Sequence, residues 1–228
     1  MIEFLFLDLD DTILDFHKAE QIALVKTFRE VGVETDQQMM ARYTAINLAH
    51  WQALERKELT RDQVVTGRFT QLFAEYGIEA DGAAVALLYE NYLSQGHYFL
   101  PGAETALKSL SKKYKLYLAS NGTAKVQAGR LKSADISRYF QKIFVSEELG
   151  ANKPDKLFFE RCAQQIPGYD PEKALMAGDS LPSDIQGGIN AGIKTVWINF
   201  RNYAPRADIV PDHTLSSISE LEALLETL

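Results

Sequence analysis

Aspartates crowd one stretch near the start of the chain. The segment "FLFLDLDDTILD", residues 4–15, begins as an apolar run and then carries Asp8, Asp10, Asp11 and Asp15. Clustered carboxylates repel one another and resist removal from water, so a positively charged partner is expected beside them. Carboxylate and carbonyl oxygens are the ligands that a hard cation such as Mg²⁺ prefers. The stretch therefore predicts a place where a cation neutralises acidic groups.

Other polar residues end or follow apolar runs further along the chain. Ser120 ends the run "KLYLAS", and Asp179 follows the run "ALMAG". Asp8 and Asp179 could supply two carboxylates to Mg²⁺, and the backbone carbonyl of Asp10 could supply a third oxygen. Asp8 and Asp10 taken alone fit a capped and solvated turn equally well.

Two residues are predicted to face an anion. Thr123 is a plausible N-cap of a helix, and its hydroxyl and the N–H groups after it would form an anion cradle. Lys153 precedes a predicted helix, where the helix dipole disfavours a cation, so its place is explained if it contacts an anion. An ordinary strand-to-helix turn and a solvated lysine are the alternatives for each residue in isolation.

A parallel sheet is the predicted frame for these groups. Short β-rich apolar runs alternate with helical stretches, a pattern typical of an α/β fold with helices on both faces of the sheet. Ligands of such sheets bind at the carboxyl ends of the strands. The predicted strands are residues 4–8, 115–120, 142–145, 174–178 and 194–198.

Residues 17–95 differ in character from the rest of the chain. They contain no convincing strand run, and their apolar spacing predicts about four helices. Thr60 and Gln63 form a predicted capping box, and Gly77 suits the end of that helix. The predicted organisation is a core of residues 1–15 and 99–228 with an all-helical domain of residues 16–98 inserted.

Composition narrows the class of partner and the compartment. The 228-residue chain has a net charge of −7, which argues against binding a nucleic-acid polymer. Its one cysteine, Cys162, excludes an internal disulfide and fits a reducing compartment. The first apolar run is too short for a signal sequence or a membrane span. We expect a cytoplasmic protein without membrane association, as a monomer or homodimer.

Taken in order, these groups resemble the four motifs of the haloacid dehalogenase superfamily of phosphatases. The resemblance extends along the whole chain, and it implies a Rossmann-like parallel core, an inserted all-helical cap domain, bound Mg²⁺ and an aspartyl-phosphate intermediate. The matching residues are Asp8, Asp10 and Thr12, then Ser120 and Asn121, then Lys153 with Pro154, and finally Gly178, Asp179 and Asp184.

The resemblance also implies a role for each matched residue. Asp8 would be the nucleophile, and Asp10 would protonate the leaving alcohol and then deprotonate water. Lys153 would bridge Asp8 and the phosphate. Ser120 and the Asn121 N–H would hold the transferring group, the metal ligands would be Asp8, Asp10 and Asp179, and Asp184 and Thr12 would support the site.

Asp10 and two longer stretches indicate the substrate class. Dehalogenases of this fold lack an acid two residues after the nucleophile, so Asp10 favours a phosphatase. Residues 8–20 and 178–199 are similar to bacterial house-cleaning pyrimidine 5′-nucleotidases, although Pro182 and Lys194 depart from that pattern. The expected substrate is a small phosphorylated metabolite, a nucleoside 5′-monophosphate. A sugar-phosphate phosphatase, a phosphomutase and a non-catalytic binding module are the alternatives.

Overall fold

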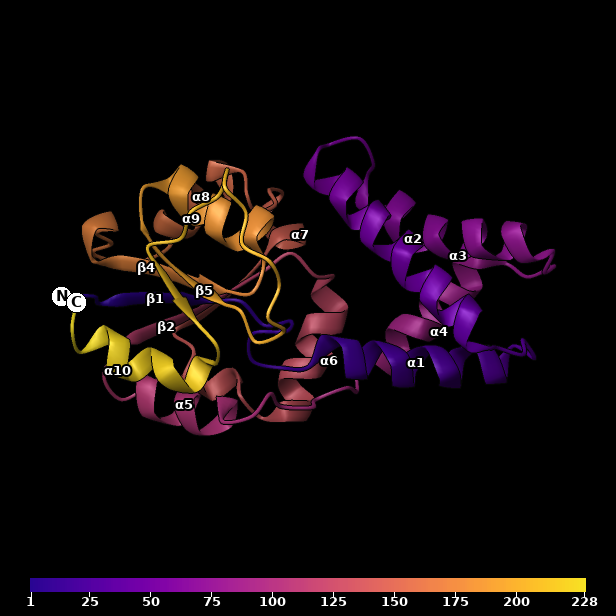
Figure 1. The fold of residues 1–228 in the computed structure, drawn as a ribbon, viewed down its shortest axis with the longest axis horizontal. Coiled ribbons are helices and arrows are strands. Elements are labelled where there is room, and N and C mark those ends of the chain that lie inside the picture. The colour runs from indigo at the N-terminus through magenta and orange to yellow at the C-terminus, as the bar shows by residue number, and fades with distance from the viewer. The chain divides into compact units, whose positions relative to one another are not determined.

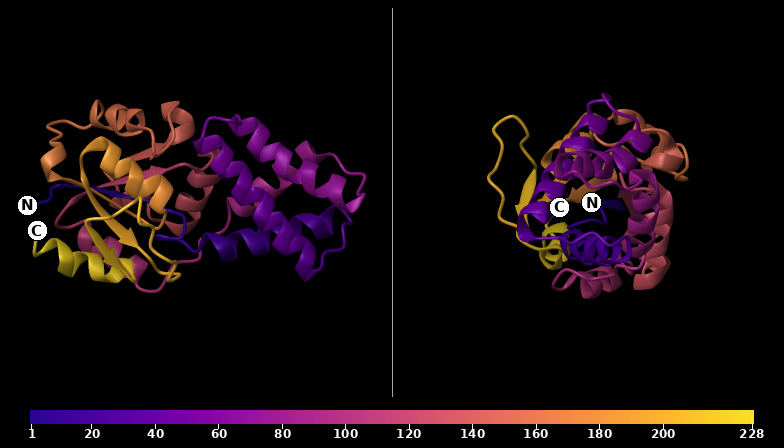
Figure 2. Two further views of the ribbon diagram at one scale, coloured as in Figure 1. Left: turned by 45° about the horizontal axis from the view of Figure 1, so that its top comes forward. Right: turned by 90° about the vertical axis from the view of Figure 1, so that its right-hand side faces the viewer.

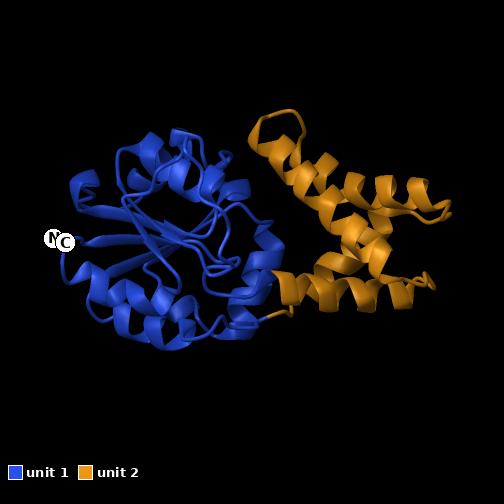
Figure 3. Ribbon diagram, viewed as in Figure 1, with its two compact units in different colours: residues 1–16, 97–228 blue, residues 17–96 orange.

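A computed structural model describes residues 1–228, which divide into two compact units (Figure 3). The first unit consists of residues 1–16 and 97–228, and the second consists of residues 17–96. Each unit has its own secondary-structure class. The first is built around a sheet, and the second is helical.

A six-stranded sheet forms the centre of the first unit, and all its pairings are parallel. The strand order is β3-β2-β1-β4-β5-β6. The five predicted strands are confirmed. The sixth was not predicted because its three residues are too few to produce a recognisable pattern. The strands are β1 (Phe4–Leu7), β2 (Lys115–Ser120), β3 (Lys142–Val145), β4 (Ala174–Gly178), β5 (Lys194–Ile198) and β6 (His213–Leu215).

Helices cover both faces of this sheet (Figures 1 and 2). One face carries α5 (Ala103–Leu110), α6 (Ala124–Ala134) and α10 (Leu221–Leu225). The other face carries α8 (Lys156–Ala163) and α9 (Gln186–Ala191). Two short turns lie near the strand ends, the helix α7 (Ser146–Leu149) and a π-helical turn over Leu181–Ile185.

The central strand β1 supplies both apolar layers because its side chains alternate between the faces. Leu5 and Leu7 belong to the layer that contains Leu107 of α5. Phe4 and Phe6 belong to the opposite layer, where the Phe6 and Phe159 rings meet edge to face with centroids 5.7 Å apart. Each such side chain contributes about 1.5–3 kcal/mol by burial, so β1 is anchored on both sides.

The second unit contains helices α2 (Gln37–Glu55), α3 (Arg61–Tyr76), α4 (Gly82–Leu93) and all of α1 (Phe16–Glu30) except its first residue. The predicted capping box is present. The backbone N–H of Gln63 donates to the Thr60 hydroxyl, and the backbone N–H of Thr60 donates to the side-chain oxygen of Gln63. Gly77 ends α3 with a φ of 64°, a conformation that favours glycine. None of the helices of the structure is both long enough and apolar enough to cross a lipid bilayer.

A buried polar network crosses the interior of the helical unit. The Arg68 guanidinium donates to Oδ1 of the Asn47 side chain at 2.8 Å, and Nδ2 of the same side chain donates to the Glu20 carboxylate at 2.8 Å. The Arg68 guanidinium also lies over the Tyr89 ring, 4.8 Å from its centroid. All four side chains are buried, so the charges of Arg68 and Glu20 are linked by an amide instead of by water.

We expect Gly188→Ala to destabilise the first unit. A Cβ atom at this position on α9 would lie 2.6 Å from the Thr195 methyl group on β5, so helix and strand would have to separate. Overpacking of this kind costs about 1–3 kcal/mol. The free energy of unfolding, measured by urea denaturation, should fall by that amount, whereas Ile189→Ala on the exposed side of α9 should change it by less than about 0.5 kcal/mol. Equal losses in the two variants would contradict the close approach.

Candidate active site

The functional groups gather where the strand order reverses. Strand β1 lies between β2 and β4, and Leu7 pairs with Leu118 on one side and Ala177 on the other. The carboxyl ends of these three strands therefore lie level with one another, and Asp8 follows the central strand. A reversal of this kind opens a crevice in which α/β proteins bind ligands.

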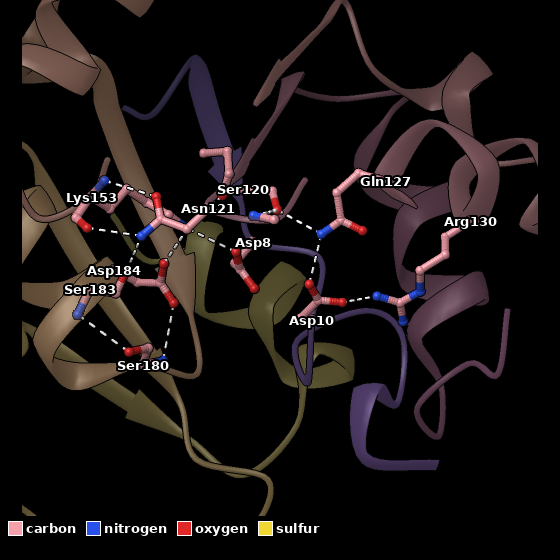
Figure 4. A network of polar contacts seen from close by, with 12 residues as sticks. Asp8, Asp10, Ser120, Asn121, Gln127, Arg130, Lys153, Ser180, Ser183 and Asp184 are labelled. Carbon is pink, nitrogen blue, oxygen red and sulfur yellow. Dashed lines mark hydrogen bonds and ion pairs between the residues drawn. The ribbon is translucent and has the colours of Figure 1, made fainter. Parts of the chain in front are cut away.

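A fully buried ammonium group ties Asp8 to Asp184 (Figure 4). The Lys153 Nζ donates to Asp8 Oδ1 at 2.8 Å, to Asp184 Oδ1 at 2.5 Å and to the Ala119 carbonyl at 2.6 Å. Burial disfavours the charge, but the Asp184 and Asp8 carboxylates outweigh it and raise the pKa of Lys153. The charged form of the lysine is therefore favoured, and Lys153 contacts Asp8 and Asp184 in the interior instead of being solvated, whereas its contact with phosphate stays a prediction.

The carboxylates outnumber this cation. Oxygen atoms of Asp8, Asp179 and Asp184 lie within 4.8 Å of one another. Burial, with the nearby Asp184 and Asp8 charges, raises the pKa of Asp179 well above its ordinary value. Burial likewise raises the pKa of Asp8 to about 8, although Lys153 opposes the shift. The charged forms of these carboxylates are therefore disfavoured without a further positive charge beside them, and oxygen ligands of this kind fit a divalent hard cation.

The hydrogen bonds of Asp184 narrow the set of metal ligands. Its two oxygens accept from Lys153 and, at 3.0 Å, from the Ser180 amide. Asp8 and Asp179 are therefore the carboxylates best suited to hold Mg²⁺. Metal ligation by Asp10, through its backbone carbonyl, stays a prediction.

The Ser120 hydroxyl accepts two hydrogen bonds from within the protein. Its Oγ accepts from the Gly122 amide at 3.1 Å and from the Gln127 side chain at 2.8 Å. With these acceptor positions occupied, the hydroxyl hydrogen can serve an acceptor outside this pair of contacts. A phosphoryl oxygen is an acceptor of that kind.

The Asn121 side chain forms hydrogen bonds with the backbone of Lys153. Its Oδ1 accepts from the Lys153 amide at 2.9 Å, and its Nδ2 donates to the Lys153 carbonyl at 2.9 Å and to Ser183 Oγ at 3.1 Å. The Asn121 side chain therefore fixes the backbone that carries the ammonium group. The predicted role of its backbone N–H toward phosphate stays a prediction.

The anion cradle predicted at Thr123 is wrong in one respect. Thr123 is the N-cap of α6, but its side chain makes no capping hydrogen bond. The first helical amide, that of Ala124, instead donates to the Glu147 carboxylate at 2.6 Å. A carboxylate is a stronger acceptor than a hydroxyl and is favoured by the helix dipole, so the protein's own anion caps this helix.

Asp10 is held by two residues that the sequence analysis missed. Arg130 Nη1 pairs with Asp10 Oδ1, and Gln127 Nε2 donates to Asp10 Oδ2 at 2.7 Å (Figure 4). Gln127 and Arg130 lie three residues apart on one face of α6. That spacing was available in the sequence, but nothing local connects it to an aspartate 117 residues earlier.

The remaining acidic residues of the first stretch also have a cationic partner. Arg201, in the loop after β5, donates to Asp11 Oδ1 at 2.8 Å and to Asp15 Oδ1 at 3.0 Å. Asp11 has a φ of 56° and so begins a tight turn. Thr12 in this turn is buried, and its hydroxyl has no hydrogen-bond partner in the protein.

Comparison with known proteins identifies the class. The sequence profile of haloacid dehalogenase-like hydrolases matches residues 2–192. The chain belongs to this family of enzymes, and the resemblance seen in its motifs is confirmed.

Several relatives align with nearly the whole chain. Pyrimidine 5′-nucleotidase PynA of Streptococcus pneumoniae is 42% identical over 96% of this chain and 93% of its own length. Pyrimidine 5′-nucleotidase YjjG of Escherichia coli is 31% identical over 98% of this chain and 97% of its own length. Among solved structures, the crystal structure of the HAD-hydrolase YfnB of Bacillus subtilis bound to magnesium matches this chain with a TM-score of 0.94. The match covers 98% of both chains, and their sequences are 38% identical.

We expect Mg²⁺ to raise the melting temperature of the protein, because an ion that binds only the folded state stabilises it by mass action. Asp179→Asn should abolish this increase. Without Mg²⁺ the variant should melt no lower than the unaltered protein, since burial and the neighbouring carboxylates already raise the pKa of Asp179 and disfavour its charged form. Thermal melts with Mg²⁺ and with EDTA measure both effects. Asp208→Asn, at an exposed ion pair with Arg206, should respond to Mg²⁺ normally, and an unchanged response in Asp179→Asn would contradict the assignment.

Proposed function

We propose that this protein is a Mg²⁺-dependent phosphomonoesterase that forms a covalent intermediate on Asp8. The observation that carries the proposal is the buried contact between Asp8 and Lys153, 2.8 Å long, with the Asp179 carboxylate in the same cluster. This contact holds a carboxylate beside a fixed positive charge, in the crevice where the strand order reverses.

The charges around Asp8 address the main obstacle to the reaction. A phosphate ester is an anion, and it repels a carboxylate that approaches phosphorus. Lys153 lowers this repulsion, and the Ser120 hydroxyl offers a donor to a phosphoryl oxygen. Asp8 and Asp179 are the residues that would hold Mg²⁺, which would supply further positive charge at the site when bound. An Asp8 oxygen then bonds to phosphorus while the bond from phosphorus to the leaving oxygen breaks.

Asp10 completes the turnover by moving protons. It lies two residues beyond the nucleophile and gives a proton to the departing alkoxide, which leaves as the alcohol. It then takes a proton from the water that attacks the phosphorus bound to Asp8. Inorganic phosphate and free Asp8 result, so the cycle balances without another reactant.

The expected substrate is a nucleoside 5′-monophosphate with a pyrimidine base. The names of two relatives that align with nearly the whole chain support this choice, and so do the motif stretches around residues 8–20 and 178–199. The alkoxide of a nucleotide is a poor leaving group, and Asp10 gives the site the acid that such a group requires.

We expect Asp8→Asn to reduce phosphate release from p-nitrophenyl phosphate by more than about 1000-fold, since it removes the nucleophile. EDTA should abolish the activity of the unaltered protein, and excess Mg²⁺ should restore it. Asp208→Asn provides the control for a surface aspartate. A fully active Asp8→Asn variant would exclude the covalent mechanism.

Phosphate release from a panel of nucleotides and sugar phosphates tests the substrate class. The ratio kcat/KM should be higher for UMP and dTMP than for glucose phosphates by at least about tenfold, a difference of 1.4 kcal/mol in transition-state binding. A preference for sugar phosphates would replace the nucleotidase proposal with a sugar-phosphate phosphatase. A requirement for a bisphosphate activator with little phosphate released would indicate a mutase.

A further inference from the structure

The Asp10 carboxylate is held at both of its oxygens. Arg130 pairs with Oδ1 from one position on α6, and Gln127 donates to Oδ2 from another, 2.7 Å away. A carboxylate bound by one donor can swing about its side-chain torsions. Two donors on separate oxygens fix both the place and the tilt of the carboxylate plane, and proton transfer depends on that geometry.

Arg130 is an unusual residue to find at this position. Its side chain is 0% exposed, whereas the side chain of Asp10 is 27% exposed. Charged residues are rarely buried so completely unless they are paired, because the desolvation of a guanidinium is unfavourable. The Phe16 ring lies 5.7 Å from the guanidinium carbon and covers part of it. The buried cation therefore presents its charge to the partly exposed acid.

Gln127 connects this acid to the residue predicted to bind phosphate. The same Nε2 group donates to Asp10 and, at 2.8 Å, to Ser120 Oγ. The other end of the amide, Oε1, is buried without a hydrogen-bond partner. The two acceptors therefore set the orientation of the Gln127 side-chain amide, although this leaves its carbonyl oxygen without a hydrogen bond. The amide group holds the Asp10 carboxylate and the Ser120 hydroxyl at a fixed separation.

We propose that Arg130 and Gln127 are positioning residues for the acid–base function of Asp10. They hold its carboxylate where it can give a proton to the leaving oxygen. The inference rests on the proposed phosphatase function and adds to it two residues outside the four motifs, of which Arg130 acts through Asp10 and Gln127 contacts both Asp10 and Ser120. It also explains why a cation is buried on α6 with no direct part in binding Mg²⁺.

The test compares leaving groups that need a proton with those that do not. The ratio kcat/KM reports the steps up to phosphorylation of Asp8, so we would measure it for UMP, phenyl phosphate and 2,4-dinitrophenyl phosphate. Arg130→Met should lower it about 100-fold for UMP and phenyl phosphate, the scale of general-acid catalysis, but less than about threefold for the dinitrophenyl ester. Arg130→Lys should recover part of the loss. Gln127→Leu removes a contact to Ser120 as well, so it should lower kcat/KM for all three esters and lower it further for the two that need a proton.

A double-mutant comparison distinguishes positioning from structure. If Arg130 acts through Asp10, then Arg130→Met should lower activity no further in an Asp10→Asn background. Lys132→Met, two residues along the same helix and exposed, is the matched control and should behave as the unaltered protein does. Equal losses for all three esters, or additive losses in the double variant, would overturn the inference in favour of a structural role.

The same measurements distinguish a failure of this inference from a failure of the proposed phosphatase function. If the unaltered protein cleaves the aryl esters but not UMP, the nucleotide assignment fails, and the two aryl esters still decide the role of Arg130. If Asp8→Asn cleaves the aryl esters as fast as the unaltered protein, the phosphatase mechanism and the inference both fall.

Discussion

One buried ammonium group holds the site together. Lys153 places its three protons on a carboxylate after β1, a carbonyl in β2 and a carboxylate in the π-helical turn after β4. Each of these contacts crosses from one segment of the chain to another. Removal of any partner would leave a charge in the interior with its desolvation uncompensated, so the segments are held together as a group. The same arrangement leaves Asp8 in contact with a positive charge, which is a requirement of the chemistry proposed for it.

The acidic stretch after β1 shows how a local excess of charge is balanced by distant residues. Lys153 contacts Asp8, Arg130 contacts Asp10, and Arg201 contacts Asp11 and Asp15. Each cation comes from a different loop or helix of the first unit. The neutralisation remains incomplete around Asp179, where burial and neighbouring carboxylates raise the pKa. Protein cations thus fix most of the aspartates in place, and Asp179, whose charged form is disfavoured by burial and by neighbouring carboxylates, lies where Mg²⁺ is proposed to bind.

The sequence was informative where structure is set by neighbours along the chain. The capping box of Thr60 and Gln63 and five strands could be predicted from local pattern, and the matched motifs located Asp8, Lys153 and Asp179. The contacts of Glu147 with α6 and of Arg130 with Asp10 could not be predicted in this way. They join residues far apart in sequence, and no periodicity encodes which side chains a folded sheet brings together. Strand β6 was not predicted for a different reason, because three residues are too few to show the alternation of apolar and polar side chains that indicates a strand.

The alternation of side chains along β1 ties the interior of the protein to its chemistry. Phenylalanines face one layer and leucines face the other, and the strand is paired on both edges. Loss of a single residue within Phe4–Leu7 would exchange aromatic and aliphatic groups between layers of different shape and would withdraw Asp8 by one position at the same time. No compensating substitution in one layer could repair both faults. Over evolutionary time, insertions and deletions should therefore accumulate in the connections, while the length of this strand remains frozen.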